Sequence, residues 1–92
     1  MTHAFVHLRI TDREALAAYR EKAVAALARH GGSVVQAGPA SVLEGTLPAP
    51  DAGAVLHFPS AEAARAWIID PTLAEVHALR NKGAQSTVFL LG

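Results

Sequence analysis

The chain has 92 residues, with eight basic and eight acidic side chains, five histidines and no cysteine. Half of it is hydrophobic (51%) and only 17% is charged, which excludes a disordered chain and predicts a single folded domain over residues 1–92. The balanced charge gives no basic stripe for nucleic acid, and the lack of cysteine excludes disulfides and thiolate metal sites.

The N-terminal residues MTHAFVHLRI do not have a basic segment followed by a long apolar run, so we expect no signal peptide. No window approaches the roughly 20 apolar residues that cross a bilayer. These two observations predict a cytoplasmic protein with no membrane partner.

The first half of the chain predicts a strand, a helix and a second strand. Residues 3–10 (HAFVHLRI) alternate between an apolar and a mixed face, as in a strand. Thr11 and Glu14 have the spacing of a capping box, which predicts a helix from about residue 12 to residue 30. Gly31 can end that helix in the left-handed conformation, and residues 33–38 (SVVQAG) predict the second strand.

The second half predicts two further strands around an interrupted helix. We expect residues 41–47 (SVLEGTL) to resume the second strand after a bulge, and residues 54–58 (AVLHF) to form the third. Ser60 caps a helix that breaks at Asp70-Pro71 and resumes until Gly83. Residues 85–91 (QSTVFLL) form the last strand.

The predicted order, β-α-β-β-α-β, gives an α+β, ferredoxin-like fold: a four-stranded antiparallel sheet with its helices on one face. Two helices can cover only one face, so Phe5, Val55 and their neighbours would meet water on the other. A second copy packing sheet against sheet would cover them. We therefore expect a homodimer through the open sheet face.

Several motifs follow one another along the chain. They are Tyr19, HGG at 30–32, EG at 44–45, FPSAEAARAW at 58–67, and Pro71 with Arg80. Together they resemble the domain-of-unknown-function family 1330, small bacterial proteins of the dimeric α/β-barrel superfamily. The resemblance implies a barrel-like dimer of two sheets, with a pocket between sheet and helices and no established general reaction.

The chain departs from the family pattern around the expected pocket. Ser33 replaces a basic residue after HGG, and His57 replaces an acidic one. Residues 68–70 and 72–73 replace more polar segments on either side of Pro71. These departures predict a less polar pocket.

Two histidines lie in the middle of strands that the topology makes neighbours. His7 and His57, together with Arg9, could bind an anion or move a proton near neutral pH. The alternative is that both are interface histidines, hydrogen-bonded across the dimer.

The expected catalytic residues are His30, Glu44 and Tyr19. His30 is either a helix cap or a pocket residue, and Glu44 is either catalytic or a structural partner of Arg80. Trp67 is either core or pocket wall. We expect Trp67 and Arg80 to join His7, Arg9 and His57 in substrate binding.

No sequence motif indicates a cofactor. A metal site built from His7, His57 and Glu44 is conceivable, but the chain lacks a metal-binding signature, a nucleophile elbow and a phosphate loop. We therefore expect no cofactor or metal. The resulting hypothesis is cofactor-independent acid-base chemistry on, or binding of, a small aromatic or carbonyl metabolite; the alternative is a non-catalytic dimeric binding or structural module.

Overall fold

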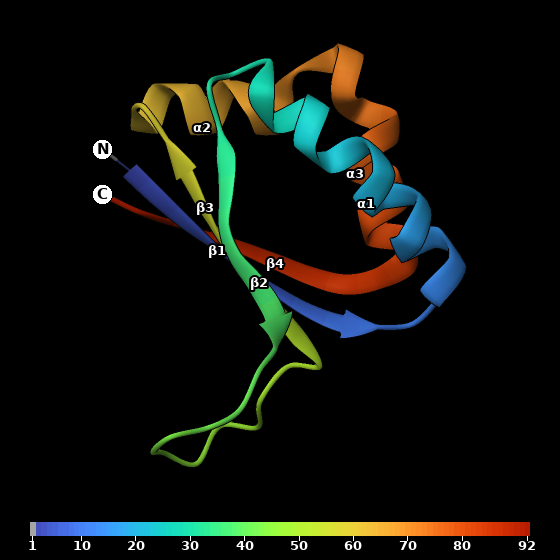
Figure 1. Cartoon of the computed structure of the whole chain (residues 1–92), viewed down its shortest axis with the longest axis vertical. Coiled ribbons are helices and arrows are strands. Elements are labelled where there is room, and N and C mark those ends of the chain that lie inside the picture. The colour runs from blue at the N-terminus through green and yellow to red at the C-terminus, as the bar shows by residue number, and fades with distance from the viewer. Residues whose placement is uncertain (1) are drawn as a thin grey trace.

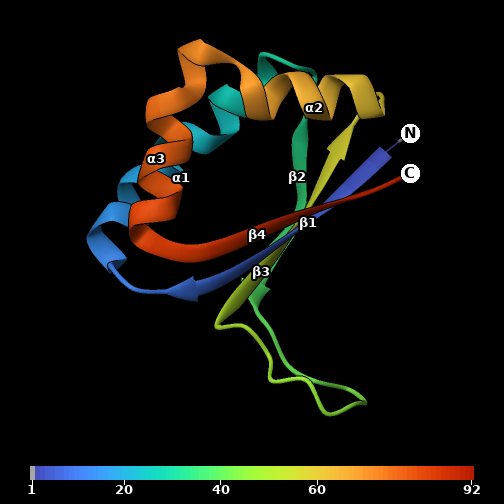
Figure 2. The same ribbon diagram turned by 180° about the vertical axis from the view of Figure 1, so that it is seen from behind.

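A four-stranded antiparallel sheet is the frame of the molecule. The computed structural model describes residues 2–92, with the strands β1 (Thr2–Ile10), β2 (Ser33–Pro39), β3 (Ala52–Phe58) and β4 (Ala84–Leu91). They lie in the order β2-β3-β1-β4. The helices α1 (Arg13–Ala28), α2 (Ala61–Ile69) and α3 (Ala74–Gly83) lie together on one side of the sheet (Figures 1 and 2). The predicted ferredoxin-like fold is confirmed, and the sheet of one chain is open rather than closed into a barrel.

The two faces of the sheet differ as the alternation of residues 3–10 predicts. In β1 the side chains of Ala4, Val6 and Leu8 are buried beneath the helices, where they join Leu56 and Phe58 in the hydrophobic core. The intervening residues of β1 face the opposite side, which carries no helix. We call this side the open face.

The cap of α1 differs from the prediction. Asp12, rather than Thr11, caps the helix: its carboxylate accepts hydrogen bonds from the N–H groups of Glu14 and Ala15, both at 3.1 Å. Thr11 instead donates its hydroxyl to the carbonyl of Lys82 at 3.2 Å. Threonine and aspartate are both good N-cap residues. Because the Thr11 hydroxyl is hydrogen-bonded to α3, Asp12 caps the helix.

The interrupted helix predicted after Ser60 is present as three pieces. Ser60 caps α2 through its hydroxyl. A 3-10 turn, η1 (Pro71–Leu73), then leads into α3. Gly83 closes α3, and a Cβ there would come within 2.5 Å of the backbone nitrogen of Leu16. This glycine therefore allows α1 and α3 to approach closely.

The prediction of a strand over residues 41–47 is wrong. Residues 40–51 contain no strand and leave the body as an extended loop between β2 and β3, seen at the bottom of Figure 1. The reason is that β3 begins at Ala52, which already pairs with Pro39 of β2, so the residues after Pro39 have no part of β3 opposite them. We call residues 40–51 the arm.

Candidate functional site

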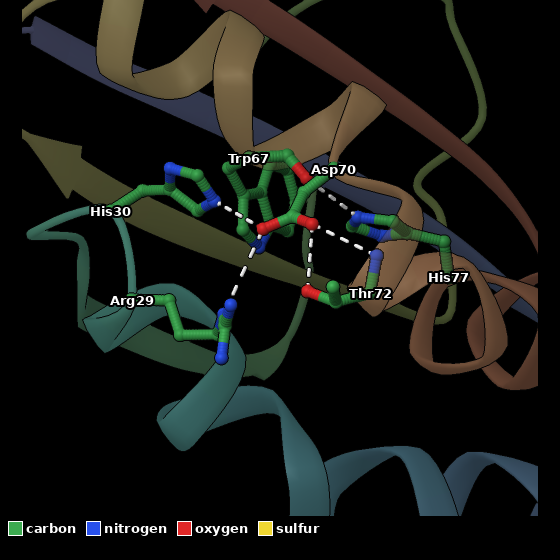
Figure 3. A network of polar contacts seen from close by, with 6 residues as sticks. All are labelled: Arg29, His30, Trp67, Asp70, Thr72 and His77. Carbon is green, nitrogen blue, oxygen red and sulfur yellow. Dashed lines mark hydrogen bonds and ion pairs between the residues drawn. The ribbon is translucent and has the colours of Figure 1, made fainter.

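One polar cluster lies where α1 ends and α2 turns into η1. After the last turn of α1, Gly31 adopts a positive φ of 71° and reverses the chain, with His30 immediately before it. The Nε2 atom of His30 lies 2.8 Å from the Asp70 carboxylate, whose other oxygen accepts from the N–H and hydroxyl of Thr72 (Figure 3). Arg29 is an ion-pair partner of Asp70 at 3.7 Å.

These contacts stabilise the charged form of Asp70. The hydroxyl of Thr72 and then the imidazole of His30 hold the pKa of the Asp70 carboxyl well below its usual range. The backbone N–H of Thr72 and the charge of Arg29 lower the pKa further. Asp70 is therefore ionised at every pH at which the protein is expected to work.

The Asp70 carboxylate also fixes the proton on His30. A carboxylate can only accept, so Nε2 of His30 must donate the hydrogen bond, and in the neutral ring Nδ1 is left as a free acceptor. An imidazole oriented by a carboxylate in this way is the usual form of a general base. The His30 side chain is 20% exposed and that of Asp70 is 12% exposed, so solvent reaches the pair.

A second, buried network joins α3 to α2 and β4. Arg80 is only 3% exposed. It donates from Nη1 to Nδ1 of His77 at 2.8 Å and from Nε to the hydroxyl of Ser86 at 3.3 Å. Its guanidinium also lies 5.7 Å from the ring centre of Tyr19 and 5.5 Å from that of Trp67. Within residues 2–92, no carboxylate pairs with this buried charge.

The network requires a neutral His77. Because Nδ1 accepts from Arg80, the proton must lie on Nε2, which donates to the carbonyl of Trp67 at 3.0 Å. Burial lowers the pKa of His77, and the adjacent Arg80 charge lowers it further, although the Trp67 carbonyl acts in the opposite direction. His77 therefore helps to hold the Arg80 charge without adding a second one.

The structure brings together some of the predicted site residues and separates others. Tyr19, Trp67 and Arg80 are in contact around the buried guanidinium. Glu44 lies on the exposed arm and forms no ion pair or hydrogen bond with the rest of residues 2–92. The salt bridge considered between Glu44 and Arg80 is therefore wrong for a single chain, because the arm leaves the body at the edge of the sheet while Arg80 is in its interior.

The open face gathers the remaining predicted residues. His7 and Arg9 line a hollow of about 300 Å³ together with polar residues of β4 and two prolines of the arm. The ring of His7 contacts that of Phe89 edge to face, with 5.3 Å between ring centres. His57 shares this face, as expected, but its partner across the strands is His3, whereas His7 lies opposite Gly53.

The imidazole of His57 has an unusual environment. Its ring centre lies 5.5 Å from that of His3. Its Nε2 atom is buried and has no hydrogen-bond partner among the described residues. Among the described residues, the indole Nε1 atom of Trp67 is likewise buried without a hydrogen-bond partner.

The sequence interpretation missed Asp70, Thr72 and His77. Asp70 was considered only as the residue before Pro71, yet an aspartate followed by proline is also a common first residue of a turn, and its carboxylate then caps the next N–H groups. His77 and Arg80 have an i, i+3 spacing, which places them on one side of a helix. These two signals indicate the Asp70 turn and the pairing of His77 with Arg80, but not the contact between Asp70 and His30.

The fold and the two clusters define a small ferredoxin-like α+β protein with an open sheet face. The family model described as a domain of unknown function, DUF1330, matches residues 2–92. The chain therefore belongs to this family.

Two solved structures illustrate the similarity. The RPA0582 protein of unknown function from Rhodopseudomonas palustris is 26% identical, with a TM-score of 0.79 over 98% of this chain and 79% of that one. A dimeric ferredoxin-like protein of unknown function from Jannaschia sp. CCS1 is 16% identical, with a TM-score of 0.70 over 99% of this chain and 97% of that one. The second similarity concerns the fold alone.

No curated protein is similar in sequence to this chain. Over the part of the chain that the structure describes, none of the helices has the length and apolar character needed to span a bilayer. In the same residues, no three histidine, aspartate or glutamate side chains gather closely enough to hold a metal ion.

Proposed function

We propose that the protein is a homodimer closed through its open face, and that it binds a small aromatic or carbonyl compound carrying a carboxylate beside His7 and Arg9. One observation carries the proposal: the open face combines an apolar centre with basic groups. Its basic and imidazole side chains are His3, His7, Arg9 and His57, and no acidic side chain of β1, β3 or β4 lies among them.

The apolar centre supports the dimer. Phe5 in β1 lies directly between Val55 of β3 and Phe89 of β4, which forms an apolar row across three strands. Phe89 is 51% exposed and Leu91, two residues further along β4, is 61% exposed. Burial of such side chains against a second sheet is favourable by roughly 25 cal/mol per Å² of apolar surface. The dimeric neighbour from Jannaschia is consistent with this arrangement.

The hollow beside the apolar row supports the ligand class. The Arg9 guanidinium can hold a carboxylate through two parallel hydrogen bonds, and the rings of His7, Pro48 and Pro50, which line the same hollow, can pack against the rest of the compound. The His7 imidazole lies in the same hollow and can exchange a proton with the bound compound. A volume of about 300 Å³ is at the small end of known ligand pockets.

The test uses benzoate, the simplest aromatic carboxylate. Millimolar benzoate is expected to raise the melting temperature of the protein, since a ligand that binds only the folded state stabilises it. The double variant H7Q/R9Q should lose this shift, and the control R13Q, which removes an exposed arginine from α1, should keep it. Equal shifts in all three proteins, or none in the wild type, would refute the site.

A non-catalytic structural module is the second candidate, and the structural contacts of His30 and Asp70 favour it. Asp70 caps η1 through Thr72 while it holds His30, so the pair ties the end of α1 to the turn after α2. Under this alternative the HGG motif serves the fold, replacement of His30 lowers stability, and benzoate leaves the melting temperature of the wild type unchanged.

A further inference from the structure

The arm carries apolar side chains that its own chain does not cover. Leu43 is fully exposed, Leu47 is 82% exposed and Val42 is 47% exposed. A loop that serves only as a connection is usually polar, and two residues are enough to join neighbouring antiparallel strands. The composition of the arm therefore points to a contact outside the chain.

The base of the arm lies against the open face. Pro48 and Pro50 line the hollow that contains His7 and Arg9. Pro50 and Ala40 line a neighbouring hollow with Phe5. Figure 1 shows the rest of the arm extending away from the helices. A second sheet packed on the open face would therefore lie beside the arm.

The charges of the arm and the open face are complementary. The arm has two acidic residues and no basic one. Asp51 is used within the chain, since it accepts a hydrogen bond from the N–H of Ile10 at 2.8 Å. Glu44, near the tip, is left as the exposed acidic group, whereas the open face carries three histidines and Arg9.

Building on the dimer proposed above, we propose that Glu44 of each protomer reaches the rim of the His7 and Arg9 hollow of the other, on the His7 side and beside the place of the ligand's carboxylate, so that each site is completed by the partner's arm. Two-fold symmetry makes the contact reciprocal, because a surface that receives an arm also presents one. Leu43 and Leu47 would pack beside the partner's apolar row, at the border of the two sheets, and the Glu44 carboxylate would lie where it can accept a hydrogen bond or a proton from His7. Glu44 thereby acquires a place in the site that it does not have within one chain.

The absence of cysteine allows a direct test that needs no ligand. One chain carries E44C and is labelled with ¹⁵N, and the other carries T87C, at an exposed position of β4 opposite His7. After mixing and mild oxidation, mass spectrometry counts disulfides between labelled and unlabelled chains. The expected disulfide forms at least about ten-fold faster than with the control E62C, placed on the exposed side of α2, because proximity raises the effective concentration. Q85C, in the same hollow, replaces T87C if that variant does not fold.

Sedimentation of the wild-type protein, which has no cysteine, distinguishes a failure of the proposed dimer from a failure of the proposed Glu44 contact. If it is a monomer, the dimer of the proposed function fails and Glu44 in trans fails with it. If it is a dimer but E44C links no faster than E62C, the dimer stands and the trans site is overturned. The double variant E44C/T87C gives the last check, since rapid disulfide formation within one chain would place the arm over its own sheet and also overturn the proposal.

Discussion

At the residue scale, the clearest result is that His30 has a carboxylate partner that fixes its proton. The motif HGG drew attention to His30, but the partner lies 40 positions later, at Asp70. Sequence spacing cannot reveal such a pair without the fold that joins the end of α1 to the end of α2. Within the sequence, the signal at Asp70 was limited to its tendency to end one helix and start another turn.

The ionised Asp70 predicts a specific pH dependence of stability. Because contacts with Thr72, His30 and Arg29 depress the pKa of Asp70 in the folded state, its contribution is present above the unfolded pKa and is lost as the pH falls through the folded one. We therefore expect wild type and D70N to differ most in free energy of unfolding above about pH 5, and the difference to shrink progressively as the pH falls below about 4.

Urea unfolding at a series of pH values measures this difference. The variant E62Q, which removes an exposed carboxylate from α2, is the control and should follow the wild type throughout. A gap between wild type and D70N that stays constant down to about pH 2 would show that the Asp70 charge is not held by these contacts.

At the element scale, alternation was a reliable guide to the sheet and a poor guide to the arm. Residues 3–10 have one apolar face, and that face is buried. Residues 41–47 contain Val42, which favours a strand, but a strand also requires a partner, and the pairing of β2 with β3 ends at Pro39 and Ala52. Local preference was overruled by the pairing already made elsewhere in the chain.

The close approach of α1 and α3 at Gly83 predicts how much stability is lost when a single methyl group is added there. In G83A the new Cβ would lie 2.5 Å from the nitrogen and 2.7 Å from the Cα of Leu16, and neither backbone atom can turn aside. Alanine favours a helix by about 1 kcal/mol at most, which is less than the cost of forcing the helices apart. We expect G83A to lose about 2 to 3 kcal/mol of stability.

Denaturant unfolding of G83A and of the matched variant G38A tests this expectation. A Cβ at Gly38 meets no atom within 4 Å, so G38A should change stability by less than about 1 kcal/mol. Equal stability of the two variants would mean that the α1 and α3 backbones are not in close contact at Gly83.

At the scale of the whole molecule, the order of the elements was enough to predict the ferredoxin-like fold and the central position of β1 and β3. The candidate site was predicted only in part. Tyr19, Trp67 and Arg80 meet because helical spacing and burial place them in one core, whereas Glu44 lies near the exposed tip of the arm and forms no ion pair or hydrogen bond with the described residues. Our proposal that a second copy supplies the environment of Glu44 explains why one sequence does not place this residue.

Sedimentation equilibrium at micromolar concentration tests the central claim, the closure of the open face by a second copy, most directly. The wild type is expected to have twice the chain mass of 9.6 kDa. F89D should be a folded monomer because it places a charge in the apolar row, and V24D, an exposed substitution on α1, should remain a dimer. A wild-type mass of 9.6 kDa at every concentration, or a dimer that F89D leaves intact, would contradict the account.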